Sequence, residues 1–284
     1  MIDTHALTPG LAAAATTAWQ RIQDHPDTEA AARLQAAVAE RQAELAAPLA
    51  RVLACSPFVA ETVRRRPAVL TDLIESGLLQ RALQPGELRE ELRQWLAAPG
   101  AELNPVLRRF RQRHMLRIVW RDFCRSADTL ETVGDTSSLA ESCIVLAQEH
   151  LAAQLQARFG TPRSARDGEP QELIVIAMGK LGARELNVSS DIDLIFAFPE
   201  AGETDGERRS ISNAEFFTKL GQGLINALDQ VTAEGFVFRV DMRLRPYGES
   251  GSLAVNFAAL EEYYQDQGRD WERYALIKAR PISG

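Results

Sequence analysis

Apolar and polar positions alternate most regularly in the middle of the chain, where two strands are predicted. Residues 173–178 form a continuous apolar run, which is typical of a strand buried on both faces. In residues 191–198 the odd and even positions differ, as they do in a strand with one face against the core. The even positions are all apolar: Ile192, Leu194, Phe196 and Phe198. Asp191 and Asp193 therefore share the opposite face.

A helix and a third strand are predicted after these two strands. Residues 212–231 begin with a segment that resembles a capping box and continue with apolar residues at three- and four-residue steps. This stripe consists of Phe216, Phe217, Leu220, Leu224, Leu228 and Val231. Residues 235–245 alternate with period two, which predicts a strand whose polar face carries Arg239, Asp241, Arg243 and Arg245 and also includes Val237. The predicted order is strand, turn with short helix, strand, helix, strand.

The first part of the chain is predicted to be helical. Residues 1 to about 155 are rich in Ala, Leu, Arg, Glu and Gln, which are strong helix formers. Prolines divide this region into five to seven predicted helices. The dividing prolines are Pro9, Pro26, Pro57, Pro67, Pro85, Pro99 and Pro105. Together with the strands that follow, this pattern predicts an α+β fold with a helical N-terminal region.

Three aspartates of the predicted strands suit a divalent metal site. Two close carboxylates raise each other's pKa unless a cation lies between them. Mg²⁺ combines one or two carboxylates with phosphate oxygens. Asp191 and Asp193 are one such pair, and Asp241 adds a third carboxylate flanked by Arg243 and Arg245, whose guanidinium groups could bind phosphate. The alternative is a solvated strand face with mutually compensating charges.

A glycine turn lies between the first two predicted strands. Gly179 and Gly182 would let the backbone approach a phosphate closely. Lys180 could offset phosphate charge, and Ser189 and Ser190 add hydroxyl donors just before the Asp-x-Asp strand. The alternative is a plain tight turn with a solvated lysine.

Composition excludes several other classes of site. The net charge is −7 and the isoelectric point is about 5.3, so broad nucleic-acid binding is not expected. A basic cluster (Arg108, Arg109, Arg111, Arg113, His114, Arg117) is interpreted as a solvated helix face, with contact to an acidic partner as the alternative. Three scattered cysteines and four scattered histidines predict neither a disulfide framework nor a zinc site. No apolar run is long enough to span a membrane and no signal peptide is evident, so we expect a cytoplasmic protein.

Several motifs together indicate a family. Residues 179–196 read Gly-Lys-Leu-Gly-Ala-Arg-Glu-Leu-Asn-Val-Ser-Ser-Asp-Ile-Asp-Leu-Ile-Phe, and residues 239–248 read Arg-Val-Asp-Met-Arg-Leu-Arg-Pro-Tyr-Gly. Residues 268–274 read Gly-Arg-Asp-Trp-Glu-Arg-Tyr. These segments resemble the bifunctional glutamine synthetase adenylyltransferase/adenylyl-removing enzymes, a family of the nucleotidyltransferase superfamily. The wording is most similar to their N-terminal, adenylyl-removing domain.

The resemblance implies a fold and a division into domains. It implies a polymerase-beta-like mixed sheet with flanking helices at residues 156–256, after a helical region at residues 1–155. Residues 257–284 would begin a further helical region. Because the family is far longer than 284 residues, the chain is expected to be a truncated form that lacks the second catalytic domain.

The resemblance also implies site residues, ligands and partners. Asp191, Asp193 and Asp241 would hold Mg²⁺ and act in catalysis. Gly179 and Ser190 would line the phosphate site. Lys180, Ser189, Arg243 and Arg245, suggested by their positions in the sequence, complete the predicted nucleotide- and phosphate-binding set. The implied reaction is phosphorolysis of an adenylylated tyrosine on glutamine synthetase, which releases ADP. The implied partners are glutamine synthetase, phosphate, ADP or ATP and, through regions absent from this chain, a PII-type signal protein.

Three alternatives stay open at this point. The same carboxylates would serve the forward reaction, in which ATP adenylylates the tyrosine and releases pyrophosphate. A polynucleotide-extending enzyme of the same superfamily is a second alternative, which the acidic isoelectric point disfavours. The third is a catalytically silent module that only docks glutamine synthetase.

Overall fold

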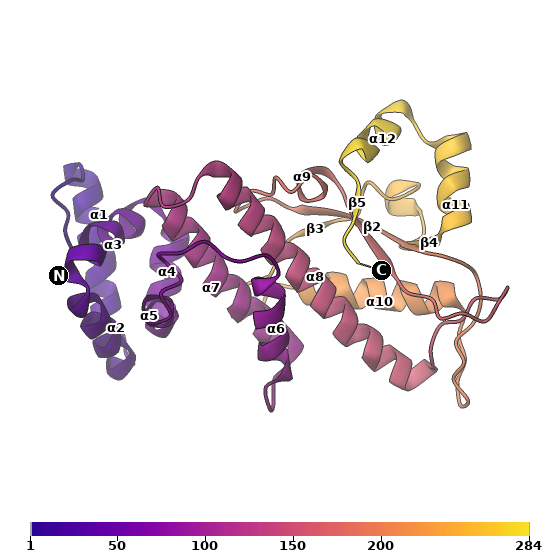
Figure 1. The fold of residues 1–284 in the computed structure, drawn as a ribbon, viewed down its shortest axis with the longest axis horizontal. Coiled ribbons are helices and arrows are strands. Elements are labelled where there is room, and N and C mark those ends of the chain that lie inside the picture. Colours follow the sequence, from indigo (N-terminus) through magenta and orange to yellow (C-terminus); the bar gives the residue numbers. More distant parts are fainter. Residues whose placement is uncertain (1, 284) are drawn as a thin grey trace. The chain divides into compact units, whose positions relative to one another are not determined.

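A computed structural model describes residues 2–283 and confirms the α+β fold (Figure 1). Helices fill the chain up to residue 159, and a mixed sheet with further helices follows. Between residues 2 and 159 the helices are α1 (Pro9–Gln23), α2 (Thr28–Glu40), α3 (Gln42–Cys55), α4 (Pro57–Arg65), α5 (Pro67–Glu75), α6 (Glu87–Ala97), α7 (Leu103–Phe123) and α8 (Thr129–Phe159). This is one helix more than the upper limit of the predicted five to seven.

The prolines act mainly at helix starts. Pro9, Pro57 and Pro67 occupy the first turns of α1, α4 and α5, where their fixed φ and missing N–H do no harm. Ser56 caps α4, because its hydroxyl accepts a hydrogen bond from the Val59 N–H at 3.3 Å. Pro48, in contrast, lies inside α3. Among residues 2–283 no helix is by itself long and apolar enough to cross a membrane, although α3 and α4, bent by 109°, pass that test as a pair.

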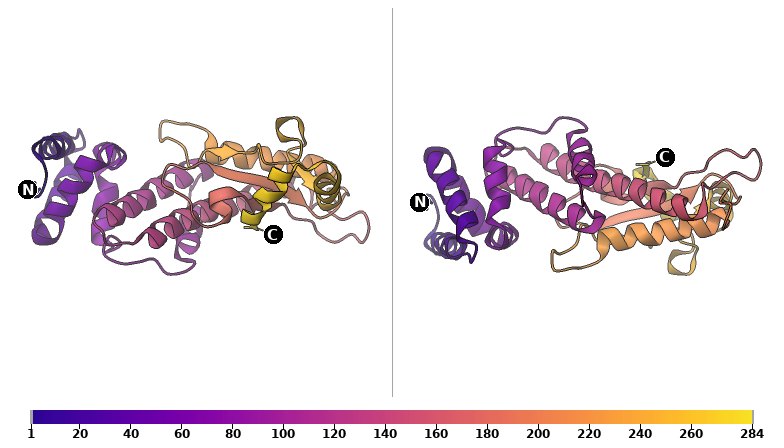
Figure 2. Two further views of the ribbon diagram at one scale, coloured as in Figure 1. Left: turned by 90° about the horizontal axis from the view of Figure 1, so that it is seen from above. Right: turned by 90° about the horizontal axis from the view of Figure 1, so that it is seen from below.

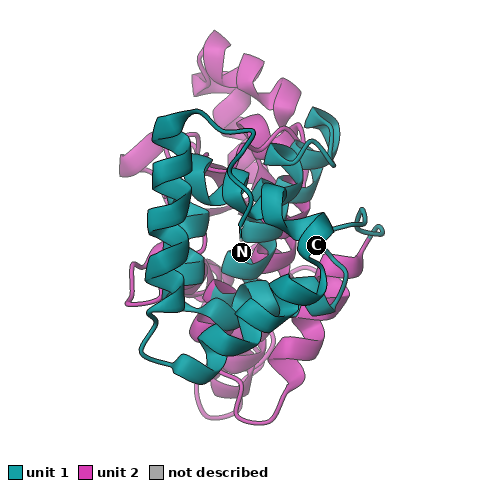
Figure 3. Ribbon diagram, turned by 90° about the vertical axis from the view of Figure 1, so that its left-hand side faces the viewer, with its two compact units in different colours: residues 1–85, 109–136 teal, residues 86–108, 137–284 magenta. Residues whose placement is uncertain are grey.

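The chain forms two compact units (Figure 3). Unit 1 comprises Met1–Pro85 and Arg109–Thr136, and unit 2 comprises Gly86–Arg108 and Ser137–Gly284. Helices α7 and α8 each contribute residues to both units. The domain boundaries given above for the sequence stay a prediction.

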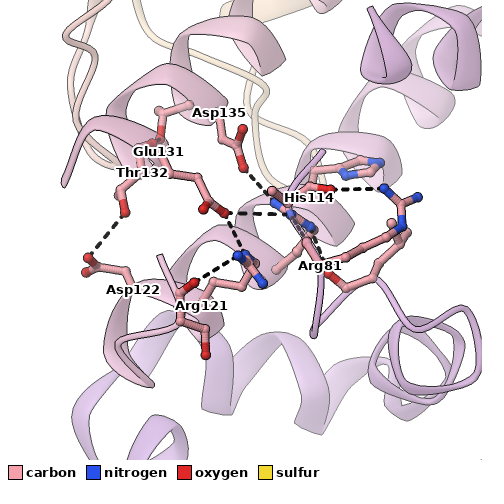
Figure 4. A network of polar contacts seen from close by, with 12 residues as sticks. Arg81, His114, Arg121, Asp122, Glu131, Thr132 and Asp135 are labelled. Atoms are coloured by element: carbon pink, nitrogen blue, oxygen red, sulfur yellow. Dashed lines mark hydrogen bonds and ion pairs between the residues drawn. The ribbon is translucent and has the colours of Figure 1, made fainter. Parts of the chain in front are cut away.

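Unit 1 contains buried arginines that bind backbone carbonyl groups (Figure 4). Arg117 is fully buried and donates to the carbonyl of Leu78 at 3.0 Å and to the Asp135 carboxylate at 2.6 Å. Arg121 pairs with Glu131 at 2.7 Å and donates to backbone carbonyls as well. These contacts satisfy the guanidinium groups away from water.

The predicted solvated face of α7 is therefore wrong for most of its basic residues. Arg113 and His114 are buried in unit 1 together with Arg117, and Arg108 is buried in unit 2. Arg108 donates to the carbonyls of Asn104 and Gly235 at 3.0 Å. Composition could not reveal this, because a buried arginine with carbonyl partners and a solvated one look alike in sequence.

Unit 2 contains a five-stranded mixed sheet with the strand order β3-β2-β1-β5, in which β4 also pairs with β2. Its strands are β1 (Ile174–Ala177), β2 (Ile192–Phe198), β3 (Val240–Asp241), β4 (Ala254–Asn256) and β5 (Arg280–Pro281). Strand β1 is antiparallel to β2 and β5, whereas β3 and β4 are parallel to β2. The α-helices of residues 160–283 are α9 (Gly179–Gly182), α10 (Asn213–Asp229), α11 (Phe257–Glu262) and α12 (Asp270–Ala275).

The predicted order of elements from residue 173 to residue 241 is confirmed: β1, α9, β2, α10, β3. Helix α10 runs along the sheet in both views of Figure 2, and a side chain at its Gly221 would clash with Phe196 of β2 at 2.8 Å. Ser212 caps α10 by accepting a hydrogen bond from the Glu215 N–H at 3.2 Å. The predicted apolar stripe is buried except at Val231, which lies beyond the helix end and is exposed.

The third predicted strand is much shorter than residues 235–245. Only Val240 and Asp241 pair with β2, and they lie opposite Ile192 and Asp193. Further along β2, residues Phe196 to Phe198 pair with β4 instead. Val237, assigned to the polar face, is fully buried. Alternation therefore placed Asp241 correctly on a strand, but the strand is only two residues long.

Candidate functional site

The glycine turn places its backbone directly beside the carboxylate of Asp193. Gly179 follows β1 with a φ of +53°, a left-handed conformation that favours glycine. A Cβ atom built on Gly179 would lie 2.8 Å from Oδ2 of Asp193. The neighbouring Met178 N–H donates to the Asp193 carbonyl at 2.9 Å. Glycine is therefore required here both for its backbone conformation and for its lack of a side chain.

Asp193 and Asp241 lie in register on neighbouring parallel strands. Residues that pair in this way point to the same face of a sheet, about 5 Å apart. Burial is the main cause that raises the pKa of Asp193, and the negative charges of Asp241 and Asp191 raise it further. The two strands thus force carboxylates together, which is the arrangement that a bound cation stabilises.

Arginines contact the other two carboxylates. Hydrogen bonds from Arg243, including Nε to Oδ2 at 2.8 Å, lower the pKa of Asp241 below its ordinary value. Asp191 precedes β2 and its side chain is half exposed; it pairs with Arg239, which also donates to the Ser189 carbonyl at 2.6 Å. Both carboxylates therefore have guanidinium groups beside them.

The other predicted phosphate-binding residues are arranged differently. Lys180 Nζ lies 3.3 Å from the Ser190 hydroxyl, so the glycine turn and the segment before β2 are in contact. Arg245 turns toward the loop that follows β3 and donates to the carbonyls of Met242 and Glu249 at 2.9 and 3.2 Å. These contacts hold the loop, and the phosphate-binding role of Arg245 stays a prediction.

An open pocket of about 420 Å³ brings several of these residues together. Its charged lining consists of Asp191, Asp241, Arg239, Arg243, Arg245, Asp229 and Glu249. Sequence reasoning placed Arg239 on the same strand face as Asp241 without assigning it to the site. Asp229, at the end of α10, had no local signal, since only the fold brings the end of that helix to β3.

The arrangement fits part of a magnesium site. Among residues 2–283 no three His, Cys, Asp or Glu side chains are gathered closely enough to hold a metal ion on their own. Mg²⁺ does not require this, because it takes one or two carboxylates and completes its shell with phosphate oxygens and water. Asp193 and Asp241 can provide the two carboxylates, and the crowding at Asp193 gives a reason for a cation there. The place of Asp191 in the ligand set stays a prediction.

Sequence comparison decides the family. A model of the family described as glutamate-ammonia ligase adenylyltransferase matches residues 46–284, which is most of the chain. The chain belongs to this family. The resemblance seen in the motifs is thereby confirmed over the glycine turn, both aspartate strands and the C-terminal segment.

Curated relatives are named bifunctional glutamine synthetase adenylyltransferase/adenylyl-removing enzyme. The relative from Pseudomonas aeruginosa is 57% identical over 91% of this chain and 26% of its own length. The relative from Nitrosococcus oceani is 52% identical over 83% of this chain and 25% of its own length. The relative from Shewanella oneidensis is 47% identical over 98% of this chain and 28% of its own length. The chain thus spans about a quarter of the length of these relatives.

Proposed function

We propose that this chain is a nucleotidyltransferase that removes AMP from an adenylylated tyrosine of glutamine synthetase by phosphorolysis. The observation that carries the proposal is the register of Asp193 with Asp241, directly beside the glycine turn at Gly179. Phosphoryl-type transfer depends mainly on positioning and on charge neutralisation, for which neighbouring carboxylates and arginines are suited. Family membership and the names of the relatives support glutamine synthetase as the protein substrate.

The proposed reaction exchanges one phosphorus–oxygen bond for another. An oxygen of inorganic phosphate forms a bond to the phosphorus of the AMP group, and the bond from that phosphorus to the tyrosine oxygen breaks. The phenol oxygen takes up a proton, so the products are ADP and unmodified tyrosine. Phosphate is already a nucleophile at neutral pH, and a dedicated histidine base is not needed.

Each residue has a proposed part in this reaction. Asp193 and Asp241 would hold Mg²⁺, with Asp191 as a further carboxylate. Mg²⁺ supplies charge neutralisation at phosphate oxygens when it is bound. Arg239 and Arg243 line the pocket and are suited to pair with phosphate oxygens, since guanidinium groups match their geometry. Gly179 leaves the room that the Asp193 carboxylate needs.

The forward reaction is the second candidate, because the relatives' names include both activities and the same carboxylates serve both directions. One experiment separates the candidates. Purified chain is incubated with adenylylated glutamine synthetase, Mg²⁺ and phosphate, and nucleotides are followed by chromatography. ADP that appears only when phosphate is present supports the proposal. Pyrophosphate formed from ATP and unmodified glutamine synthetase supports adenylylation instead, and binding without turnover supports a docking module.

A matched pair of variants controls this experiment. Asp193→Asn removes the central carboxylate and is expected to abolish ADP formation. Asp205→Asn changes a carboxylate of the same unit that accepts hydrogen bonds from Arg163 at 2.8 Å and from the Thr161 N–H at 2.7 Å. Because neither partner is a proposed site residue, this variant is expected to retain activity. A PII-type partner stays a prediction that this experiment does not address.

A further inference from the structure

Helix α8 presents a row of buried polar side chains within unit 2. Ser137, Glu141 and Gln148 are spaced by four and seven residues, which places them on one face of the helix. All three are buried. Burying a polar group costs free energy unless the group has a hydrogen-bond partner. The partners of these three side chains therefore identify the segments that this helix face stabilises.

The partners of this face surround the glycine turn. The Ser137 hydroxyl accepts a hydrogen bond from the Leu186 N–H at 3.1 Å, just after the turn. Gln148 donates to the Leu173 carbonyl at 2.6 Å, just before β1. Between these two contacts, the Glu141 carboxylate accepts a hydrogen bond from Arg280 of β5 at 2.5 Å.

Arg280 connects this helix to the turn itself. Its Nε donates to the Gly182 carbonyl at 3.0 Å and its Nη2 donates to the Leu181 carbonyl at 3.1 Å. The guanidinium fork therefore binds both final carbonyls of α9 while Glu141 fixes the guanidinium. A lysine could not reproduce this, because an ammonium group lacks the rigid planar fork.

The backbone of the C-terminal segment presses against the same turn. A Cβ atom at Gly182 would lie 1.7 Å from the Lys278 carbonyl oxygen and 2.6 Å from the Ala177 carbonyl oxygen. Lys278 also pairs with Glu185 at 2.8 Å, on the far side of the turn. Ile282 N–H donates to the Val175 carbonyl at 2.9 Å, which ties the segment to β1. The turn is thus held from two sides.

We infer that Glu141 and Arg280 are positioning residues that fix the glycine turn against Asp193. Neither contacts the reacting groups. Arg280 acts through the carbonyls of Leu181 and Gly182. Glu141 acts through Arg280 and through Arg184, which follows α9 and pairs with the Glu141 carboxylate at 3.3 Å. The link to catalysis is Gly179, at the other end of the same four-residue helix, which lies against the Asp193 carboxylate. The importance of this contact for nucleotide binding rests on the proposed function, whereas the restraint of the turn does not.

Amide hydrogen exchange of the full chain tests the restraint without any ligand. The probes are the N–H groups of Gly182, Ala183 and Glu185, which bond to backbone carbonyls within the turn. In Arg280→Ala and in Arg280→Lys these amides are expected to exchange about tenfold faster, the scale of one lost charge-assisted hydrogen bond. Glu141→Gln is expected to speed the exchange of the same amides, and it provides the test if Arg280→Ala does not fold. The control Asp205→Asn is expected to leave them unchanged. Unchanged exchange in the folded Arg280 and Glu141 variants would overturn the inference.

Titration with ADP and Mg²⁺ measures the consequence for the site. Arg280→Ala is expected to weaken ADP binding by about tenfold, the lower range for residues that support a ligand-binding group. Millimolar guanidinium is expected to restore part of this affinity, while sodium at equal ionic strength is not, since only guanidinium can occupy the vacated fork. A wild-type chain that binds no ADP would count against the proposed function, and the exchange experiment would still decide whether Arg280 restrains the turn. ADP binding by Arg280→Ala equal to wild type would contradict the link from the turn to the site.

Discussion

Asp193 and Asp241 lie side by side on neighbouring parallel strands, yet their environments shift their pKa values in opposite directions. Burial raises the pKa of Asp193, and hydrogen bonds from Arg243 lower that of Asp241. Neighbouring carboxylates whose pKa values are shifted in opposite directions are typical of catalytic and metal-binding sites.

Replacing Asp193 by Asn should remove the carboxylate that lies closest to the glycine turn. We expect phosphate-dependent ADP formation to fall at least about a hundredfold, the scale for losing an electrostatic group at a transition state. The fold should persist, because the change relieves repulsion between carboxylates. Initial rates and circular dichroism of the variant check both statements. Activity like that of the wild type would remove Asp193 from the mechanism.

Gly179→Ala should damage the same site from the backbone side. The new Cβ would lie 2.8 Å from Asp193 Oδ2, and alanine is strained at a φ of +53°. We expect a loss of about 1–3 kcal/mol in the free energy of unfolding, as for a non-glycine residue forced into the left-handed region, together with weaker activity. Denaturant unfolding measures the first effect. Gly10→Ala is the control, because a Cβ there meets no atom within 4 Å. Equal stability of the Gly179 and Gly10 variants would contradict the close approach.

The structure also explains which parts of this site the sequence could predict. Alternation in residues 191–198 placed Asp193 opposite a buried face, and the strand exists as expected. Alternation in residues 235–245 placed Asp241 on a strand but overestimated the length of that strand. Before it, the N–H groups of Val237 and Phe238 bond to the Leu228 carbonyl; after it, β4 occupies the β2 edge from Phe196 to Phe198. That competition involves residues about 60 positions apart, which no local pattern contains.

Buried polar contacts were the main feature that sequence reasoning missed. The spacing of the α7 arginines predicts a solvated helix face, and nothing in it reveals that carbonyl groups satisfy Arg108 and Arg117. Arg280 and Glu141 lie 139 positions apart, so their pairing depends on the completed fold. Motifs indicated the family correctly, while the supporting contacts needed the three-dimensional structure.

Asp135→Asn tests the buried ion pair of unit 1. Burial raises the pKa of Asp135 and lowers that of Arg117, so each charge depends on the other. Breaking a fully buried pair costs about 3–5 kcal/mol, and here the upper end is not expected, because Asp135 is partly exposed and Glu131 stays 4.0 Å from the buried Arg117. We expect a loss of that order in the free energy of unfolding, measured by denaturant titration. The matched control is Glu75→Gln, which breaks an exposed pair with Arg33 and should cost less than about 1 kcal/mol. Equal losses in the free energy of unfolding for Asp135→Asn and Glu75→Gln would contradict a larger contribution from the Arg117–Asp135 pair.

The pH dependence of unit 1 should show a contribution from Glu61. Hydrogen bonds from Arg64 are the main cause that lowers its pKa from 4.5 to about 2. A lowered carboxyl pKa stabilises the folded state above pH 4.5, and this stabilisation is lost as the pH falls toward 2. Because the pair is partly exposed, the effect should stay below about 1 kcal/mol. Thermal unfolding of wild type and Glu61→Gln should differ at pH 6 and converge near pH 2; a constant difference would contradict the assignment.

The most direct test of the central claim follows the fate of labelled phosphate. Chain, Mg²⁺, adenylylated glutamine synthetase and ³²P-labelled inorganic phosphate are incubated, and the nucleotides are separated. Phosphorolysis predicts that the label appears in the β-phosphate of ADP, with wild type and Asp205→Asn but not with Asp193→Asn. Unlabelled AMP as the product, or labelled ADP formed equally by Asp193→Asn, would contradict phosphorolysis at the Asp193–Asp241 site.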